Sequence, residues 1–285
     1  MSHYPFILSQ GKFLHKDSLL FPYEERGLQF GDGVYEVIRI YHGDLYLLDE
    51  HVARLYRSLK AISISIEQSP QQMKQLLKTL VKKNEMTQDG YIYLQISRGS
   101  SERIHTFPEQ ITPNMYAYIH NQPRPFDYLD EGIKTITHRD ERWKNCYIKS
   151  LNLLPNILAK QTAIEKGCYE AILVNDDGVV TECCSSNIFL VKNNTIFTHP
   201  PTKRILHGCV RDAIIRFSEK LSIQLIEEPF TKSELVEADE LFLTSSISEV
   251  LPIIAVDDMQ IGDGTPGKIT RKLQAEYDKD AGLIL

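Results

Sequence analysis

The sequence contains no uninterrupted apolar run of about 18 residues, so no segment is expected to cross a bilayer as a helix. The N-terminus, Met1 to Pro5, leads into polar sequence rather than into a charged segment and a long apolar one, so we expect no secretory leader. Basic residues are outnumbered, with 32 lysines and arginines against 38 acidic residues, and they form no cluster. The net charge of −6 argues against nucleic acid or an anionic membrane as the main partner.

Cysteine is present but shows no functional pattern. The five cysteines make an odd number, two are adjacent and no spacing is typical of a metal site: they are Cys146, Cys168, Cys183, Cys184 and Cys209. Neither a disulfide framework nor a bound metal is therefore indicated, and we expect a reduced, cytoplasmic protein. With 285 residues, of which 42% are hydrophobic and 25% charged, the chain is long enough for one large globular domain or two smaller ones.

A short proline-rich segment divides the chain. Gln122-Pro123-Arg124-Pro125 favours an extended backbone, because each proline also restrains the residue before it. We place the domain boundary there, with a first domain at residues 1–120, a linker at 121–126 and a second domain at 127–285.

Local signals predict where several helices begin and end. Ser69-Pro70 opens a helix with apolar residues at helical spacing, and Asn84 is expected to end it. Asp49 is expected to cap the preceding helix. Thr231 and Glu234 have the spacing of a capping box at the start of a short helix.

Lys149 places one ammonium group in an otherwise largely apolar run, Cys146 to Leu154. Such a lysine either extends its amine to water or is held where the charged form is disfavoured. The second case gives the neutral amine that Schiff-base chemistry needs. Taken alone, the run favours the other interpretation, a surface lysine at a strand end. The next residues predict a helix, with Asn152 as its cap, Pro155 in its first turn and Ile157, Leu158, Ala163 and Ile164 at helical spacing.

Glu182 returns toward this region on a predicted hairpin. An apolar strand at residues 169–174 is followed by the turn Asp176-Asp177-Gly178 and by a second strand that ends at the glutamate. The small residues of Cys183-Cys184-Ser185-Ser186-Asn187 come next, and they would let another group pack closely.

The order Ile148-Lys149-Ser150-Leu151-Asn152, then Gly167 to Ala171, then Val180 to Asn187 resembles the fold-type IV pyridoxal-phosphate enzymes, and most of all the D-amino-acid aminotransferases. The resemblance implies a two-domain α+β fold, with a smaller N-terminal domain, a barrel-like sheet in the larger C-terminal domain and the cofactor between them. It implies that Lys149 binds pyridoxal 5'-phosphate as a Schiff base and transfers the substrate proton. Glu182 would face the pyridine nitrogen and keep it protonated.

The resemblance also implies the residues that anchor the cofactor. Arg54 matches the family's phosphate-binding arginine, and a guanidinium fork suits a buried phosphate. Gly208 leaves the first backbone N–H groups of a predicted helix available for an anion. The expected cofactor contacts are completed by these residues: Ser185, Leu206 beneath the ring, Cys209, Val210 and Ser246. Val210 and Ile247 stand where relatives often have threonine, so we expect somewhat weaker phosphate binding.

Three residues are candidates for binding the substrate. Tyr35 follows the bend Phe30-Gly31-Asp32-Gly33. Sequence alone slightly favours a core aromatic, but the resemblance implies that this hydroxyl faces the substrate. Arg103 and His105 point the same way in an extended loop. They resemble the pair that binds the substrate α-carboxylate in D-amino-acid aminotransferases, where the loop reaches the neighbouring subunit's site. This implies a homodimer acting on an amino acid and a 2-oxo acid, such as D-alanine and 2-oxoglutarate.

Alternative interpretations remain within and outside this family. A branched-chain L-aminotransferase or an aminodeoxychorismate lyase would share Lys149 and Glu182 but not the Arg103/His105 pair. A nucleotide-binding protein could use Gly262 to Thr270, which nearly fits a P-loop, although Ile269 stands where magnesium binding needs a hydroxyl and a turn before the last helix is favoured. A hydrolase could use Cys183 or Cys184 as a nucleophile.

Overall fold

The computed structural model describes residues 4–20 and 22–284. Most of the N-terminal segment Met1 to Pro5, where no secretory leader is expected, therefore lies outside the described residues. The chain forms two compact units. The first consists of residues up to Pro123 together with the segment Ile148–Asn152, and the second consists of Arg124–Tyr147 and the chain from Leu153 onward. The domain boundary at residues 121–126 stays a prediction.

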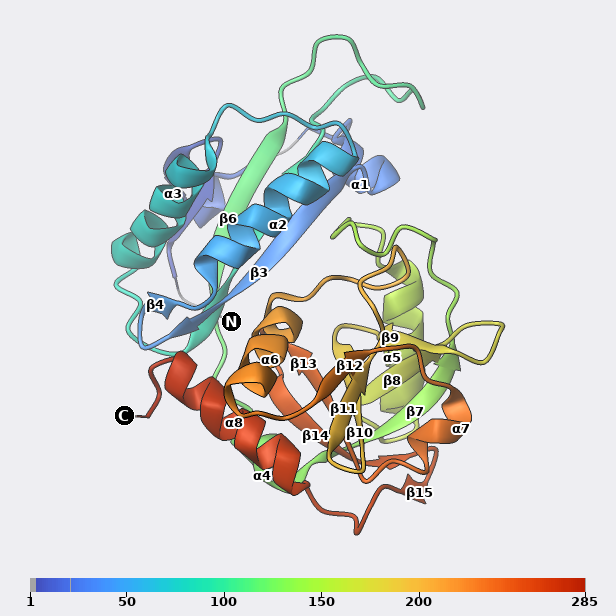
Figure 1. Ribbon diagram of the computed structural model, residues 1–285. Helices are drawn as coiled ribbons and strands as arrows, with labels where there is room; N and C mark the ends of the chain where they lie inside the picture. The colour runs from blue at the N-terminus through green and yellow to red at the C-terminus, as the bar shows by residue number, and fades with distance from the viewer. Residues whose placement is uncertain (1–3, 21, 285) are drawn as a thin grey trace. The chain divides into compact units, whose positions relative to one another are not determined.

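The first unit is a six-stranded antiparallel sheet in the order β2-β1-β6-β5-β3-β4. Helices α2 (Leu48–Ala61) and α3 (Pro70–Lys83) lie against the sheet (Figure 1). A 3-10 turn (Lys16–Ser18) and the short helix α1 (Arg26–Phe30) precede β3. The strands are β1 (Phe6–Ser9), β2 (Lys12–His15), β3 (Gly33–Tyr41), β4 (Asp44–Leu45), β5 (Gly90–Ser97) and β6 (Asn114–Asn121).

Capping explains where α3 begins, but not where α2 begins. Ser69 and Gln72 form the reciprocal hydrogen bonds of a capping box at the start of α3, and Asn84 ends that helix, as predicted. The prediction that Asp49 caps α2 is wrong. The N-cap of α2 is Leu47, in the left-handed region at φ 51°, whereas Asp49 lies inside the first turn and pairs with Lys74 at 2.7 Å.

The second unit contains a nine-stranded mixed sheet in the order β12-β11-β10-β13-β14-β7-β8-β9, with β15 paired to β14. The sheet curls as a half-barrel, which confirms the predicted α+β class and barrel-like sheet (Figure 1). The strands are β7 (Ile133–Arg139), β8 (Glu170–Val174), β9 (Val180–Cys183), β10 (Asn187–Lys192), β11 (Thr195–Thr198), β12 (Leu225–Glu227), β13 (Glu240–Ser245), β14 (Glu249–Val256) and β15 (Met259–Gln260). The helices are α4 (Phe126–Glu131), α5 (Leu154–Glu165), α6 (Cys209–Lys220), α7 (Lys232–Leu235) and α8 (Lys268–Asp280).

Helix α5 differs from its prediction at both its start and its surface. Pro155 lies in the first turn as predicted, but the N-cap is Leu153 and not Asn152. The Asn152 side chain instead donates to the carbonyl of Gly31 at 3.4 Å. Of the apolar residues noted at helical spacing, Ala163 is buried, whereas Ile157, Leu158 and Ile164 are more than half exposed.

The core of the second unit consists largely of buried apolar side chains from the strands of the curled sheet. β10 and β13 are buried along most of their length, and the rings of Phe189 and Phe242 stack with centroids 4.7 Å apart. Thr231 and Glu234 form the predicted capping box at α7. This rigid sheet fixes the positions of the loops that leave β9 and β13.

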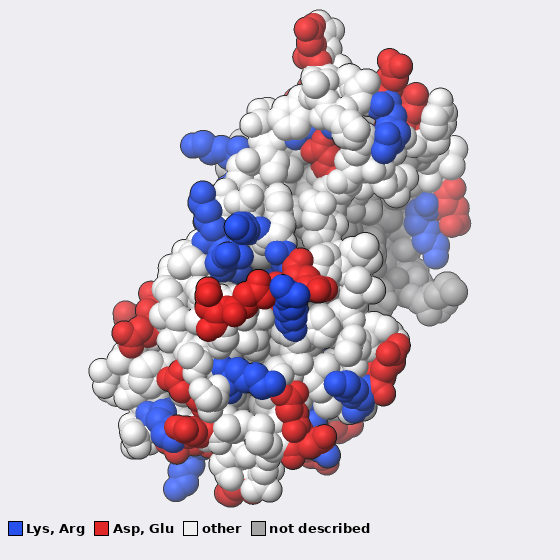
Figure 2. Space-filling model, turned by 90° about the vertical axis from the view of Figure 1, so that its right-hand side faces the viewer, with Lys and Arg blue, Asp and Glu red and all other residues white. Residues whose placement is uncertain are grey.

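The described surface carries charge of both signs. On the face drawn in Figure 2, lysine and arginine side chains lie interspersed with aspartate and glutamate. None of the described helices is long and apolar enough to cross a membrane.

Candidate active site

Lys149 is held against the first strand of the site by its backbone. The segment Ile148–Asn152 runs antiparallel to the start of β3, with Val34 paired to Ser150. The Tyr35 N–H donates to the Lys149 carbonyl at 3.0 Å, and the Lys149 N–H donates to the Ser58 hydroxyl on α2 at 3.2 Å. Both peptide groups of the lysine are thereby fixed, while its side chain stays available for chemistry.

The Lys149 amine faces an aromatic ring. Its Nζ lies 4.2 Å from the centroid of the Tyr35 ring, and Tyr35 in turn stacks on Tyr93 with centroids 5.7 Å apart. A cation over a ring face is attracted by the ring quadrupole, which limits the positions of the amine. The structure thus brings Lys149 and Tyr35 together.

Arg54 is buried and not solvated, because it forms a two-pronged ion pair with Glu36. Its Nε donates to Oε1 of Glu36 at 2.8 Å and its Nη2 donates to Oε2 at 2.7 Å. His51 adds a third contact, with Nδ1 2.7 Å from Oε2. Burial raises the pKa of Glu36, but Arg54 and His51 outweigh burial and hold that pKa far below its usual value. Sequence reasoning missed Glu36 and His51.

Arg103 and His105 lie on the loop between β5 and β6, and both are exposed. The structure brings them together on one aromatic ring: the Arg103 guanidinium carbon is 5.0 Å from the centroid of Phe30, and the His105 ring centroid is 5.6 Å from it. Arg26 anchors the loop by donating from Nη1 to the carbonyl of Ile104 at 2.8 Å. The pair is therefore presented jointly on an anchored, exposed loop.

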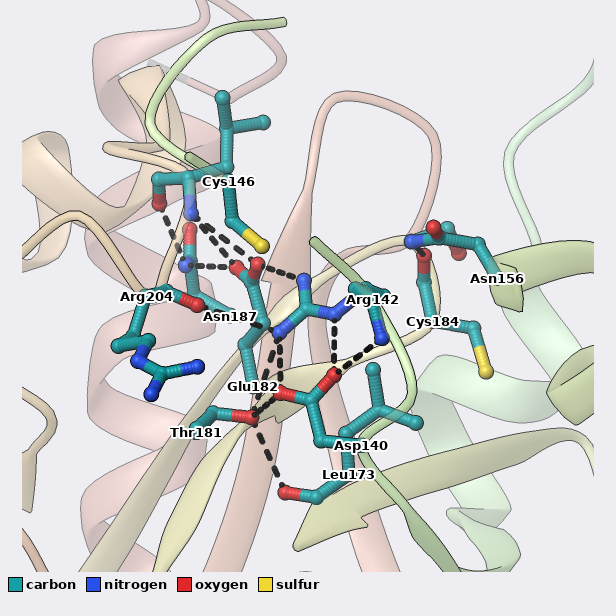
Figure 3. A network of polar contacts seen from close by, with 12 residues as sticks. Asp140, Arg142, Cys146, Asn156, Leu173, Thr181, Glu182, Cys184, Asn187 and Arg204 are labelled. Carbon is teal, nitrogen blue, oxygen red and sulfur yellow. Dashed lines mark hydrogen bonds and ion pairs between the residues drawn. The ribbon is translucent and has the colours of Figure 1, made fainter. Parts of the chain in front are cut away.

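In the second unit, Glu182 is a buried carboxylate at the end of β9 (Figure 3). It accepts hydrogen bonds from Nη1 of Arg142, from Nδ2 of Asn187 at 2.9 Å and from the N–H of Leu206 at 3.1 Å. Burial raises the pKa of Glu182, and Arg142 and the Leu206 N–H limit the rise. The Leu206 N–H is shared between both oxygens, so these three donors make four contacts with the carboxylate.

Arg142 connects this carboxylate to a second one. Its Nε and Nη2 donate to the two oxygens of Asp140, each at 2.9 Å, and Asp140 also accepts from the Thr181 hydroxyl at 2.7 Å. Sequence reasoning missed Arg142, since Arg139-Asp140-Glu141-Arg142 has the composition of a solvated turn. Its role depends on a partner on another strand, which no local pattern indicates.

The loop at residues 204–208 carries Leu206 into helix α6. Asn187 donates to the carbonyl of Leu206 at 2.8 Å, and Gly208 is the N-cap, without any side-chain cap. A Cβ at Gly208 would collide with the side-chain oxygen of Asn187, so glycine is required there. Cys209 and Val210 form the first turn of α6, where backbone N–H groups and the helix dipole favour an anion.

Ser246 and Ser185 occupy different surroundings. Ser246 is half-buried in the turn between β13 and β14. The Ser185 hydroxyl donates to Glu170 at 3.2 Å, and Glu170 also pairs with Lys160 at 2.8 Å. Both serines stay predictions as cofactor ligands, and Ser185 already has a structural partner.

The sequence profile of the amino-transferase class IV family matches residues 33–256. The chain belongs to this family. A D-alanine aminotransferase of Bacillus licheniformis is 44% identical over 268 residues, which make up 94% of each chain. One from Staphylococcus aureus strain N315 is 40% identical over 274 residues, or 96% of each chain.

Solved structures support the same family. The branched-chain amino acid aminotransferase of Escherichia coli superposes with a TM-score of 0.91 at 25% identity, covering 97% of this chain and 94% of that one. The branched-chain aminotransferase of Thermoproteus uzoniensis, solved with norvaline, gives a TM-score of 0.88 at 26% identity, covering 97% and 95%. Both likenesses extend over nearly the whole of this chain.

Class IV aminotransferases use pyridoxal 5'-phosphate, and the residues present fit this group. Lys149 supplies an amine whose backbone is fixed on both sides. Glu182 supplies a buried carboxylate of the kind that pairs with a protonated ring nitrogen. The α6 N-terminus lacks a side-chain cap and starts at a glycine whose replacement would bring a Cβ into collision. The amine, the carboxylate and the helix N-terminus therefore suit the aldehyde, the pyridine nitrogen and the phosphate of the cofactor, respectively.

The structure disfavours both alternatives from other classes. The nucleotide-binding interpretation needs an anion at the start of α8, but Glu240 already accepts there from the N–H groups of Ile269 at 2.9 Å and Thr270 at 2.8 Å. Residues 261–267 form the predicted turn. The hydrolase interpretation needs a thiolate, whereas burial raises the pKa of Cys183 well above its usual value and that of Cys184 to about 12.

Proposed function

We propose that this class IV aminotransferase transfers the amino group of a D-amino acid, such as D-alanine, to a 2-oxo acid, such as 2-oxoglutarate. The products of that pair are pyruvate and D-glutamate. The observation that carries the D assignment is the joint placement of Arg103 and His105 on Phe30. The D-alanine aminotransferase relatives at 44% and 40% identity support it.

Lys149 has the central role in the proposed reaction. Bound pyridoxal phosphate supplies an electron sink for the pair left behind when the substrate Cα loses its proton. Lys149 would hold the cofactor through Nζ until an incoming substrate amine takes its place. As a neutral amine, Nζ would then accept the proton that leaves the substrate Cα and return it during transfer. Tyr35 limits the position of Nζ by ring contact at 4.2 Å.

The remaining cofactor residues hold the group still while bonds to Cα change. Glu182 keeps the proton on the pyridine nitrogen, and Leu206 packs against the ring. The phosphate would be held by a charged fork, by helix N–H groups and by a hydroxyl: Arg54, Cys209, Val210 and Ser246. Ser185 is proposed as a further cofactor contact. Val210 and Ile247 lack the hydroxyl of a threonine, which weakens phosphate binding without removing the backbone donors.

Arg103, His105 and Tyr35 hold the substrate α-carboxylate and so decide which face of Cα meets Lys149. We further propose a homodimer in which the Arg103/His105 loop serves the site of a second copy. The exposure of both side chains in a single chain supports this arrangement. All five cysteines are buried free thiols, which supports a reducing, cytoplasmic location.

The decisive experiment is the near-ultraviolet and visible spectrum of the purified protein, recorded before and after addition of D-alanine or L-alanine. We expect a cofactor band that the D isomer alone converts. A band that responds only to L substrates would refute the D assignment and favour a branched-chain L-aminotransferase. Absence of any band after addition of pyridoxal phosphate would refute the role of Lys149.

A further inference from the structure

Three buried charged side chains of the second unit, Asp140, Arg142 and Glu182, form a chain that ends at the candidate cofactor ligand Glu182 (Figure 3). The three side chains are 8%, 6% and 6% exposed, so two carboxylates share one guanidinium away from water. Among the described hydrogen-bond and ion-pair partners of Glu182, Arg142 is the one that carries charge. The ionisation of Glu182 therefore depends on this arginine.

We propose that Arg142 is a positioning residue that holds Glu182 as a carboxylate and aims it at the ring nitrogen of pyridoxal phosphate. The proposal rests on the proposed function, because it concerns the same cofactor. It adds a residue that is proposed to act through Glu182 and not by contact with cofactor or substrate.

The planar fork of Arg142 sets the geometry. Nε and Nη2 are both held by Asp140 at 2.9 Å, which fixes the plane of the guanidinium and hence the direction in which Nη1 meets Glu182. Nη2 also donates to the carbonyl of Arg204 at 3.2 Å, two residues before Leu206. The same side chain thus steadies the carboxylate and the loop that leads to α6. A lysine offers one point charge and cannot reproduce this fork.

The ionisable groups around Glu182 do not replace Arg142. Burial raises the pKa of Cys146 to about 11 and that of Cys183 well above its usual value, so both thiols stay neutral near pH 7. Burial lowers the pKa of His199, so this ring favours the neutral form. Asp140 adds negative charge and raises the pKa of Glu182. Removal of Arg142 thus leaves two buried carboxylates facing each other, and Glu182 takes up a proton.

The test compares Arg142→Met with the wild type and with Arg139→Met, a matched control whose arginine is 67% exposed and pairs with Asp176. The dissociation constant of pyridoxal phosphate is measured by absorbance or fluorescence titration from about pH 6 to about pH 9. As the pH falls below the pKa of Glu182 in the variant, we expect the ratio of the variant's dissociation constant to the wild-type constant to rise about tenfold per pH unit. The ratio for Arg139→Met should stay near one.

Two outcomes would overturn the proposal. A ratio near one throughout means that Arg142 does not support Glu182, and a large ratio that is independent of pH means that its role is merely structural. If Arg142→Met does not fold, Arg142→Lys decides: we expect about tenfold weaker binding with the wild-type pH profile, and unchanged binding contradicts the positioning role. Failure of the wild type itself to bind pyridoxal phosphate would refute the proposed function instead.

Discussion

The buried ion pair between Arg54 and Glu36 allows a quantitative prediction. Replacing Arg54 with methionine keeps the apolar stem but leaves the Glu36 carboxylate buried without its two-pronged partner. Breaking a buried pair from one side costs about 3 to 5 kcal/mol of unfolding free energy, whereas replacing both partners by neutral groups costs far less. We therefore expect Arg54→Met to be less stable than the double variant Arg54→Met/Glu36→Gln.

The pH dependence of stability provides an independent check. Arg54 and His51 lower the folded-state pKa of Glu36, so this carboxylate contributes stability above its unfolded pKa of about 4.3 and loses it as the pH falls toward the lowered value. We expect the stability advantage of the wild type over the double variant to be full above about pH 5 and to shrink between about pH 4 and about pH 2.

The assay is urea unfolding followed by far-ultraviolet circular dichroism for the wild type, both single variants and the double variant. The four free energies form a cycle whose coupling term isolates the pair. Arg139→Met, which removes an exposed ion pair, serves as the control and should change stability by less than about 1 kcal/mol. A coupling term below about 1 kcal/mol would show that Arg54 and Glu36 do not act as a buried pair.

Three further predictions concern the site. Arg103→Ala should raise the KM for D-alanine sharply while leaving pyridoxal phosphate binding unchanged; an unaltered KM in steady-state assays would contradict its role as a carboxylate ligand. Ser58→Ala leaves the Lys149 N–H without its acceptor and should cost about 1 to 2 kcal/mol in urea unfolding, and a neutral result would mean that this contact does not hold the lysine. Gly208→Ala forces a Cβ into Asn187, so it should weaken cofactor binding in equilibrium titration and lower stability by about 1 to 3 kcal/mol; wild-type affinity would refute the close approach.

Sequence patterns correctly predicted the helix starts that depend on neighbouring residues. The capping boxes at Ser69 and Thr231 work within one turn of helix, so spacing alone was enough to find them. Asn152 shows the limit: its amide reaches Gly31, more than a hundred positions away in the sequence, and the expected cap does not form. Tertiary partners override local propensity at such positions.

The candidate site was only partly predictable for the same reason. The motifs around Lys149 and Glu182 are short and unusual, so the resemblance could place them. Their supporting partners could not be found, because Arg142 and Glu36 acquire their roles from side chains on other elements, Glu182 on β9 and Arg54 on α2. In sequence they have the composition of ordinary surface charges, and only burial and distance distinguish them.

The segment Ile148–Asn152 has a consequence for the order in which the protein is made. It belongs to the first unit although the residues on both sides belong to the second, so neither unit is one continuous piece of chain. As the nascent chain leaves the ribosome, β3 can pair first with β4 and then with β5, and β6 can pair with β5. The backbone groups of Gly33 and Tyr35 that bond to residues 149 and 151 stay open until residue 152 has emerged. The segment that carries Lys149, the proposed Schiff-base lysine, is the last part of the first unit to leave the ribosome, and a fragment ending at Pro123 would lack it altogether.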